Sequence, residues 1–347
     1  MKGINFLGDR KLVVKEFPKP TPVGGDVLVK MRASAICGTD MHHFRKSWDE
    51  LVAYRKGLNG STDTITGHEP SGVVEAVGPD VINVKIGDRV SVYQHFGCGT
   101  CTHCVAGNVM DCPERRGMGS AKNGSAADYL MCPERNCMPI PDWLSFEKAA
   151  VLSCAGGTGY QSVKRLNIQP GETLAIFGLG PVGLSALMFG IAAGAKIFGV
   201  DIIPERLELA KKLGAKETIN AASSNPVTEL INLTNGVGVD AAADYSGNKN
   251  SQHAIMEAGR KGGRAVVVGM GGNFTVSTGT MIDKQFTLMG SWVYNKDQFS
   301  EIIRYVGENN VPIEDMITHR FTLDQAQEAL DLFDAGKAAK IVFTWRD

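Results

Sequence analysis

The sequence has almost no excess charge of either sign. Its 347 residues include 36 lysines and arginines against 37 aspartates and glutamates, a formal net charge of −1. No global electrostatic field is therefore available to attract a phosphate backbone or an anionic lipid surface, which argues against nucleic-acid and membrane partners. The start, MKGINFLGDRKLVVKEFPKP, lacks the unbroken apolar run of a secretion signal. We therefore expect a cytoplasmic protein.

Internal repeats, low-complexity segments and a proline- or serine-rich tether are also absent. Hydrophobic residues make up 43% of the chain and charged residues 21%, a globular composition despite 41 glycines. The length exceeds one domain of ~100–200 residues, so we expect two cores. One charge-free stretch, residues 173–195, is long enough to span a bilayer. Its glycines and Pro181 instead predict a buried strand, a tight turn and a buried helix.

The predicted elements change in kind along the chain. Residues 1 to about 150 form short extended runs between turn signals, which is typical of antiparallel β structure. From Thr173, apolar strands alternate with helical segments, a pattern that predicts a parallel sheet covered by helices. Two amphipathic helices and a last strand end the chain. The fold class is therefore α/β, with predicted domains at residues 1–155 and 156–290 and a segment 291–347 that packs back on the first.

A glycine-rich turn lies between the predicted strand and helix that begin the parallel sheet. It matches G-x-G-x-x-G with Gly178, Gly180, Pro181, Val182 and Gly183. The first glycine can make the tight turn, the second lets backbone approach a pyrophosphate, and the third lets helix and strand pack closely. The helix N-terminus that follows offers N–H groups to a phosphate. The turn predicts a dinucleotide site, although a glycine turn without a cofactor remains an alternative.

An aspartate at the end of the next predicted strand indicates which dinucleotide binds. Asp201 follows the glycines by about 20 residues, where a carboxylate accepts hydrogen bonds from an adenosine ribose. A 2′-phosphate would be repelled there, so NAD is favoured over NADP. Arg206 is close enough in sequence to keep NADP open as an alternative. Asp201 could otherwise be an ordinary helix-start carboxylate.

Four of the eight cysteines are closely spaced, as C-x2-C-x2-C-x7-C. In a chain without a secretion signal, cysteines point to reduced thiols, metal ligands or catalysis. The four thiolates can enclose one tetrahedral Zn²⁺, and a closed four-sulfur shell orders a loop rather than binding substrate. An iron–sulfur run would have a final spacing of three, so zinc is favoured. These residues are Cys98, Cys101, Cys104 and Cys112.

Three other metal-ligating residues are far apart in sequence. They are Cys37, His68 and Cys154. One imidazole and two thiolates give Zn²⁺ three protein ligands and leave a fourth position for water or substrate, the arrangement of a catalytic site. Each residue alone would more often be a buried filler or a satisfied polar group.

Taken in order, these motifs resemble the zinc-dependent medium-chain alcohol dehydrogenases over nearly the whole chain. The resemblance rests on CGTD, GHEPSGVVEAVG followed by GDRV, the four-cysteine segment, LSCAGGTGY, and GLGPVG with its downstream aspartate. It implies a GroES-like N-terminal domain that carries both zinc ions and a Rossmann domain that binds NAD. It also implies an active site in the cleft between the two domains. Members of this family are usually dimers or tetramers of identical chains.

The resemblance also assigns roles to single residues. Cys37, His68 and Cys154 match the catalytic zinc ligands, and Asp40 matches the carboxylate that orients His68. Glu69 adjoins the site. In similar polyol dehydrogenases that glutamate can be a ligand where the position of Cys154 is itself a glutamate, so Cys154 favours the alcohol-type site.

Two further residues match a proton relay. Thr39 matches the hydroxyl that receives the proton of the substrate alcohol, and His42 matches the histidine that passes it to solvent through the cofactor ribose. His43, beside it, has no matching role. Near the C-terminus, Lys340 is a rough match to a basic residue that the family often places at the pyrophosphate.

The segment between Cys37 and His68 is longer than its counterpart in simple alcohol dehydrogenases. Trp48, Tyr54 and Arg55 would make it an aromatic and cationic pocket wall, which suits a polar or hydroxylated substrate. The alternative is an ordinary surface helix with Tyr54 packed inward.

Three functions follow from these patterns. The favoured one is oxidation of a primary or secondary alcohol by NAD, or the reverse reduction of a carbonyl compound. The second keeps this chemistry for a polyol, a sugar or L-threonine. The third is a zinc-stabilised binding or redox-sensing module without turnover, for which reactive thiols would be the selected feature. The open three-ligand site and the Thr39/His42 pair disfavour the third.

Overall fold

A computed structural model describes residues 1–345 as two compact units. The first unit comprises residues 1–154, 295–304 and the chain from Ile317 onward, and the second comprises residues 155–294 and 305–316. Within the described residues, none of the helices has the length and apolar character needed to cross a membrane. The charge-free stretch of the sequence is instead a strand and a helix of the second unit, as predicted.

The second unit is built on a six-stranded parallel sheet in the order β12-β11-β10-β13-β14-β15. This is the doubly wound order of a Rossmann fold, in which the chain runs outward from the first strand in both directions. The strands are β10 (Thr173–Phe177), β11 (Lys196–Asp201), β12 (Glu217–Asn220), β13 (Val239–Asp244), β14 (Gly259–Val267) and β15 (Thr287–Gly290). Their side chains are mostly small or β-branched and buried, as strands covered on both faces require.

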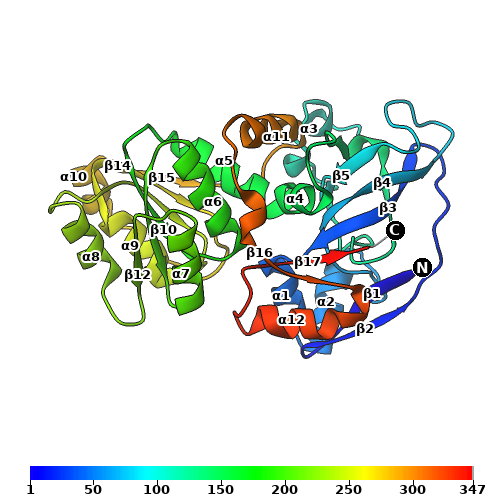
Figure 1. Cartoon of the computed structure of the whole chain (residues 1–347), viewed down its shortest axis with the longest axis horizontal. Helices are drawn as coiled ribbons and strands as arrows, with labels where there is room; N and C mark the ends of the chain where they lie inside the picture. The colour runs from blue at the N-terminus through cyan, green and yellow to red at the C-terminus, as the bar shows by residue number, and fades with distance from the viewer. Residues whose placement is uncertain (346–347) are drawn as a thin grey trace. The chain divides into compact units, whose positions relative to one another are not determined.

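Helices connect and cover these strands (Figure 1). Helices α6 and α7 pack against β10 and β11, and α9 and α10 pack against β14. The unit contains α5 (Gly157–Leu166), α6 (Pro181–Ala192), α7 (Pro204–Lys212), α8 (Pro226–Leu233), α9 (Lys249–Glu257) and α10 (Thr278–Lys284). At the start of α6, a Cβ on Gly183 would lie 1.9 Å from the carbonyl oxygen of Gly178. Only glycine therefore allows the close helix–strand packing that the motif predicts.

The first unit is β-rich, with a seven-stranded sheet whose main order is β16-β17-β3-β4-β5-β9, while β8 also pairs with β3. The strands of the whole unit, including those outside this sheet, are β1 (Lys2–Gly8), β2 (Lys11–Glu16), β3 (Asp26–Ala35), β4 (Glu69–Val77), β5 (Arg89–Val92), β6 (His95–Phe96), β7 (Arg116–Gly117), β8 (Tyr129–Pro133), β9 (Cys137–Pro139), β16 (Ile317–Phe321) and β17 (Lys340–Thr344). Strand β17, red in Figure 1, runs antiparallel beside the blue β3. The end of the chain therefore completes the sheet that begins near its start.

The first unit also contains short helices. They are α1 (Gly38–Phe44), α2 (Trp48–Gly57), α3 (Thr102–Val105), α4 (Phe146–Val151) and α12 (Ala326–Asp334). An apolar core joins α1 and α12 through Phe44 and Phe333 and extends to Ile341 on β17. Helix α11 (Phe299–Glu308) is amphipathic, as its sequence predicts, and the division between the two units falls within it.

The last part of the chain does not belong wholly to the first unit, contrary to the expectation for segment 291–347. Residues 305–316 group with the second unit. The physical reason is side-chain packing. The ring of Tyr305 makes an edge contact with the ring of Tyr160, with centroids 5.3 Å apart, and the Ser185 hydroxyl donates to the sulfur of Met316 at 3.5 Å. The first contact is made by α11 and the second by the residues after it, and an amphipathic pattern cannot indicate which neighbour the apolar face of a helix will meet.

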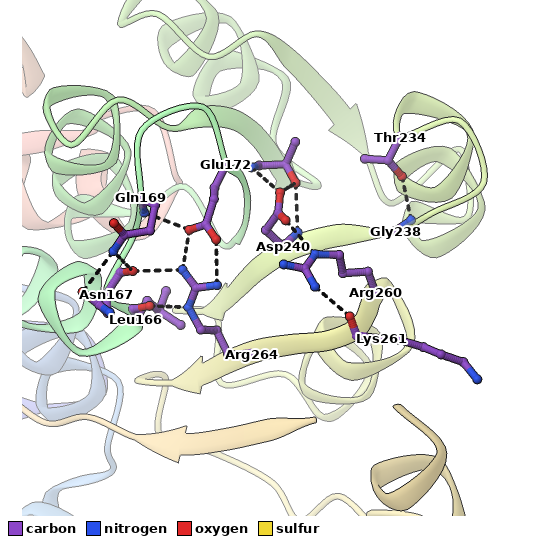
Figure 2. Close-up of polar contacts among 11 residues, drawn as sticks. Leu166, Asn167, Gln169, Glu172, Thr234, Gly238, Asp240, Arg260, Lys261 and Arg264 are labelled. Carbon is purple, nitrogen blue, oxygen red and sulfur yellow. Dashed lines mark hydrogen bonds and ion pairs between the residues drawn. The ribbon is translucent and has the colours of Figure 1, made fainter. Parts of the chain in front are cut away.

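A network of ion pairs ties together the amino ends of three strands in the second unit (Figure 2). Arg264 on β14 pairs with both oxygens of Glu172 and donates to the carbonyl of Asn167. Asp240 on β13 accepts from the N–H of Thr173 at 2.8 Å and pairs with Arg260 at 2.6 Å. Burial alone would raise the pKa values of Glu172 and Asp240, but these partners hold both pKa values below normal. The network joins strands that are distant in sequence.

We expect Arg264→Met to lower the free energy of unfolding at pH 7 by about 2 kcal/mol, because it leaves a largely buried carboxylate without its cation. Since folding depresses the pKa of Glu172, this contribution is present above the ordinary carboxylate pKa of 4.5. It is lost as the pH falls through the folded pKa. Chemical unfolding of both proteins at pH 7 and at pH 4 measures the difference.

The matched control is Lys261→Met, which removes an ion pair to Asp283 between two mostly exposed side chains. We expect that change to alter the free energy of unfolding by less than about 0.5 kcal/mol. Equal losses in the two variants would show that Arg264 acts only as a surface charge.

Candidate active site

The site is organised where α1 begins. Cys37 precedes the helix, and its backbone N–H donates to Asp40 Oδ2 at 2.8 Å. The other oxygen of the same carboxylate, Oδ1, lies 3.1 Å from His68 Nδ1. A proton on Nδ1 leaves Nε2 of His68 as the free donor for a metal. One buried carboxylate therefore orients two of the predicted ligands at once.

The third predicted ligand lies on a distorted helix. Cys154 belongs to a π-helical turn, Leu152–Gly156, that interrupts the path from α4 to α5. Such turns are rare and are often found at functional sites. The sulfurs of Cys37 and Cys154 are 4.0 Å apart. The donor atoms of Cys37, His68, Glu69 and Cys154 all lie within 4.8 Å of one another. Residues from three distant segments thus meet as one buried cluster.

This cluster fits a tetrahedral zinc ion. Two sulfurs that each lie about 2.3 Å from a tetrahedral metal are about 3.8 Å apart, close to the separation of Cys37 and Cys154. The charges also fit. A hydrogen bond from Cys154 and the charge of His68 lower the pKa of Cys37 despite its burial, which favours the thiolate that binds metal. The pKa of Cys154 is raised by its bond to Cys37 and by burial. Metal binding here must therefore displace a proton.

Glu69 and Lys340 form an ion pair next to this cluster. Both side chains are fully buried, and Lys340 Nζ lies 2.5 Å from Glu69 Oε2 and donates to the carbonyl of Ile36 at 2.8 Å. Burial raises the pKa of Glu69 to about 7, and the charge of Lys340 opposes this rise. Lys340 is thus engaged inside the first unit, rather than free for the pyrophosphate role that its position suggests. The signal in the sequence is a lysine within the apolar strand AKIVF.

The two predicted relay residues lie on α1. Thr39 Oγ1 is 3.8 Å from Cys37 Sγ, so its hydroxyl adjoins the donor cluster. His42 follows three residues later on the same short helix, and both side chains are exposed. A spacing of three places them on one helix face. His43, for which the sequence suggests no role, is half-buried.

The four-cysteine segment forms a second donor cluster. Its sulfurs lie within 4.8 Å of one another, with Cys98 and Cys104 4.0 Å apart. Backbone N–H groups of Thr100 and Cys101 donate to Cys98 Sγ and lower the pKa of that thiol to about 6. A Cβ on Gly97 would lie 2.5 Å from Cys104 Sγ. The segment is therefore folded tightly around the sulfurs, which fits one tetrahedral metal ion. The members are Cys98, Cys101, Cys104 and Cys112.

The glycine turn of the second unit has room for a phosphate. Gly180 precedes α6 as its N-cap residue and provides no side-chain cap, and a Cβ there would meet no atom within 4 Å. The first N–H groups of α6 are thus open to an anion. Asp201 ends β11, and its Oδ2 accepts from the N–H of Leu179 at 2.7 Å. Arg206 Nη1 lies 3.8 Å from the same oxygen. The predicted residues of this turn lie together at the carboxyl ends of the strands.

The three candidate wall residues between Cys37 and His68 all lie on α2, and their surroundings differ. Arg55 is only 2% exposed, and it donates to the carbonyl of Thr62 at 2.6 Å and to the side chain of Asn5 at 3.0 Å. It therefore supports the fold and is neither a cationic wall nor a surface residue. Trp48 is exposed, whereas the ring of Tyr54 lies against His43. The prediction of a cationic wall at Arg55 is wrong because its guanidinium is buried and donates hydrogen bonds within the fold.

Comparisons with known proteins agree with this geometry. Residues 24–142 match the alcohol dehydrogenase GroES-like domain, and residues 181–308 match the zinc-binding dehydrogenase family. An uncharacterized zinc-type alcohol dehydrogenase-like protein of Escherichia coli K12, YphC, is 35% identical over 98% of this chain and 97% of its own. An L-threonine 3-dehydrogenase of Shewanella sp. MR-7 is 31% identical over 99% of this chain and all of its own.

Solved structures resemble the whole chain. The alcohol dehydrogenase TADH of Thermus sp. ATN1 has a TM-score of 0.90 at 28% identity, and both chains are fully covered. An alcohol dehydrogenase of Escherichia coli CFT073, solved with NADH, has a TM-score of 0.87 at 25% identity and 99% coverage of each chain. The Rossmann sheet, the β-rich unit and these similarities define an oxidoreductase. The chain belongs to the zinc-dependent medium-chain alcohol dehydrogenase family.

We expect Lys340→Met to lower the free energy of unfolding by about 3–5 kcal/mol, because it leaves the Glu69 carboxylate buried without its cation. The double variant Lys340→Met/Glu69→Gln should recover part of this loss, since it removes both charges. Chemical unfolding of the metal-loaded proteins measures both values.

Lys2→Met is the control, because it breaks an exposed ion pair with Asp324 in the same unit. It should leave the free energy of unfolding unchanged within experimental error, because an exposed ion pair contributes little. A Lys340→Met variant as stable as this control would mean that Glu69 finds another partner or is protonated.

Proposed function

We propose that the protein is an NAD-dependent dehydrogenase that oxidises an alcohol to an aldehyde or ketone. The observation that carries the proposal is the buried cluster of Cys37, His68 and Cys154 beside the Thr39 hydroxyl. Three ligands leave a tetrahedral metal one position for a substrate oxygen. The glycine turn at the start of α6 supports a dinucleotide partner in the same chain.

We further propose that the chain holds two zinc ions. Cys37, His68 and Cys154 would bind the catalytic ion, while the ion pair with Lys340 engages Glu69 and keeps it from being a ligand. The four clustered cysteines would bind a structural ion, because their closed sulfur shell leaves no position for substrate. When bound, zinc supplies Lewis acidity that lowers the pKa of an alcohol hydroxyl, and NAD supplies the acceptor for a hydride.

The protein's own residues then orient the ligands and move the proton. Oxidation breaks the O–H and C–H bonds of the carbinol, and bound NAD would accept the hydrogen of the C–H bond together with its electron pair. The remaining proton must leave the site, and the exposed Thr39 hydroxyl, whose Oγ1 lies 3.8 Å from Cys37 Sγ, would accept it. His42 follows on the same helix face and would pass the proton onward. Asp40 keeps His68 in the tautomer that presents Nε2.

The choice of NAD is supported by Asp201. Its carboxylate lies at the end of β11, where a 2′-phosphate would meet a negative charge. Arg206 pairs with that carboxylate rather than standing free for a phosphate. The residues proposed to contact the cofactor are Gly178, Gly180, Pro181, Val182, Gly183, Asp201 and Arg206. The similar alcohol dehydrogenase solved with NADH gives further support.

We propose a homo-oligomer, a dimer or a tetramer. Strand β15 is one of the two edge strands of the Rossmann sheet. An open sheet edge can pair with the same edge of a second chain across a two-fold axis.

Initial-rate assays test the function. Zinc-loaded protein should reduce NAD⁺ in the presence of secondary alcohols, diols or L-threonine, and should reduce NADP⁺ more slowly. We expect Cys37→Ser and His68→Ala to lose hydride transfer and one zinc ion per chain, because each removes a ligand of the open site. Both variants should still bind NADH, which titration of NADH fluorescence measures.

Cys104→Ser is the comparison variant, since it should lose the other zinc ion and destabilise the four-cysteine segment. Loss of NADH binding in Cys37→Ser or His68→Ala would contradict the assignment. Wild-type protein with two zinc ions that reduces neither cofactor with any of these alcohols would overturn the proposed function.

Thr39 provides a test of the proton path. Thr39→Ala should lower kcat by ~10²–10⁴, the usual contribution of a positioned proton-transfer group. Thr39→Ser keeps the hydroxyl and should retain most of the rate. Equal rates for Thr39→Ala and the wild type would mean that another group carries the proton.

A further inference from the structure

The order of strands in the second unit indicates where a dinucleotide crosses its sheet. The chain passes from β10 outward to β11 and β12, and then returns to β13 on the other side of β10. Ligands of such sheets bind at this reversal, beyond the carboxyl ends of the two central strands. Asp201, at the end of β11, is proposed to bind the adenosine. The nicotinamide half of the cofactor then lies toward β13 and β14.

Two loops follow β13 and β14 at this end of the sheet, and their backbones touch. They are the β13 loop, residues 245–248, and the β14 loop, residues 268–272. A Cβ on Gly247 would lie 2.5 Å from the carbonyl oxygen of Met270, and a Cβ on Gly269 would collide with the backbone nitrogen of Gly247. Glycine at these positions therefore allows the two loops to lie side by side.

The β13 loop also meets the glycine turn of the proposed cofactor site. A Cβ on Gly178 would lie 2.8 Å from the backbone nitrogen of Ser246. Gly178 has a positive φ of 93°, a conformation that glycine adopts without strain. The two loops are therefore continuous with the turn that has room for a phosphate.

One buried carboxylate holds the β13 loop. Asp244 is the last residue of β13, and it is fully buried. Its Oδ1 accepts from the backbone N–H of Ser246 at 3.0 Å and from the hydroxyl of the same residue at 2.6 Å. Its Oδ2 accepts from the N–H of Gly247 at 3.2 Å. Hydrogen bonds to a carboxylate are stronger than those to a neutral acceptor, so this side chain fixes the path of the loop.

The same residue also holds the β14 loop. The carbonyl oxygen of Asp244 accepts from the N–H groups of Val268 and Gly269, both at 2.9 Å. Gln252 on α9 is only 2% exposed, and its Nε2 lies 3.4 Å from Asp244 Oδ2 and donates to the carbonyl of Gly269 at 3.2 Å. Asp244 and Gln252 therefore join two loops that are separated by about 20 residues in the sequence.

We propose that Asp244 is a positioning residue for the nicotinamide half of the cofactor, and that it acts through the two loops whose backbones it holds. The inference rests on the proposed NAD-dependent function and adds a residue outside the proposed cofactor contacts. A loop offers its N–H and C=O groups at fixed places only where its path is fixed, and a ligand that must order a loose loop binds more weakly. Because the carboxylate is fully buried, it orders the loops rather than contacting the nicotinamide.

Calorimetric titration of the zinc-loaded protein with NADH and with ADP tests the proposal. ADP has the adenosine and the phosphates of the cofactor but lacks the nicotinamide and its ribose. Asp244→Asn keeps the shape of the side chain and replaces one carboxylate oxygen with a donor, which cannot accept from Gly247 or Gln252. We expect Kd for NADH to rise about tenfold, because hydrogen bonds to a charged group are lost, and Kd for ADP to change by less than about twofold.

Asp240→Asn is the matched control. Asp240 lies near the amino end of the same strand, where its carboxylate accepts from Thr173 and pairs with Arg260. This variant also weakens a carboxylate network, but it should leave the ratio of Kd for NADH to Kd for ADP unchanged. Gln252→Met keeps Asp244 and removes the donor that joins the loops, so it should raise this ratio about threefold, and it serves where Asp244→Asn does not fold.

Two results would contradict the inference. A ratio in Asp244→Asn and Gln252→Met equal to that of the wild type would mean that these residues act on the stability of the unit alone. That result would overturn the positioning role and leave the dehydrogenase function standing. A wild-type protein that binds ADP but does not bind NADH would overturn the inference and the proposed NAD-dependent function together.

Discussion

The candidate site depends on one carboxylate. Asp40 accepts a hydrogen bond from the N–H of Cys37 with one oxygen and contacts His68 Nδ1 with the other. The first bond shapes the start of α1, which brings Thr39 and His43 to the same face. The second selects the tautomer of His68. A single side chain thus links Cys37, just before α1, to His68, just before β4, and holds both proposed metal ligands in place.

The arrangement of strands explains why these residues meet. Glu69, at the start of β4, is opposite Ala35 near the end of β3, and Val342 on β17 is opposite the same residue from the other side. Strands on both sides of β3 therefore bring Glu69 and Lys340 to the point where the chain leaves the sheet for Cys37. The buried cation offsets negative charge in a region that also holds the two sulfurs proposed to bind metal, those of Cys37 and Cys154. The last strand of the protein is thus part of the electrostatics of the site, although it supplies no donor atom.

Much of the fold and of the candidate site could be predicted from local patterns in the sequence. The cysteine spacings, the glycine turn with Asp201, and the alternation of strands and helices each have a local physical cause and were readable in the sequence. Other features were not. Arg55 is a charged residue on a short helix, and only the positions of the Thr62 carbonyl and of Asn5 decide that it is buried. Residues 305–316 join the second unit because Tyr305 meets Tyr160, a neighbour far away in the chain.

The sequence by itself determined the family, the fold class and the residue types available for metal and nucleotide binding, because these depend on spacing and on side-chain chemistry. Only the tertiary structure decided how those residues are partnered. It joined Lys340 to Glu69 and brought the ring of Tyr54 against His43. The first pairing arises from strand register across a long sequence separation, and the second from the packing of two consecutive short helices. No local pattern encodes a partner that lies hundreds of residues away.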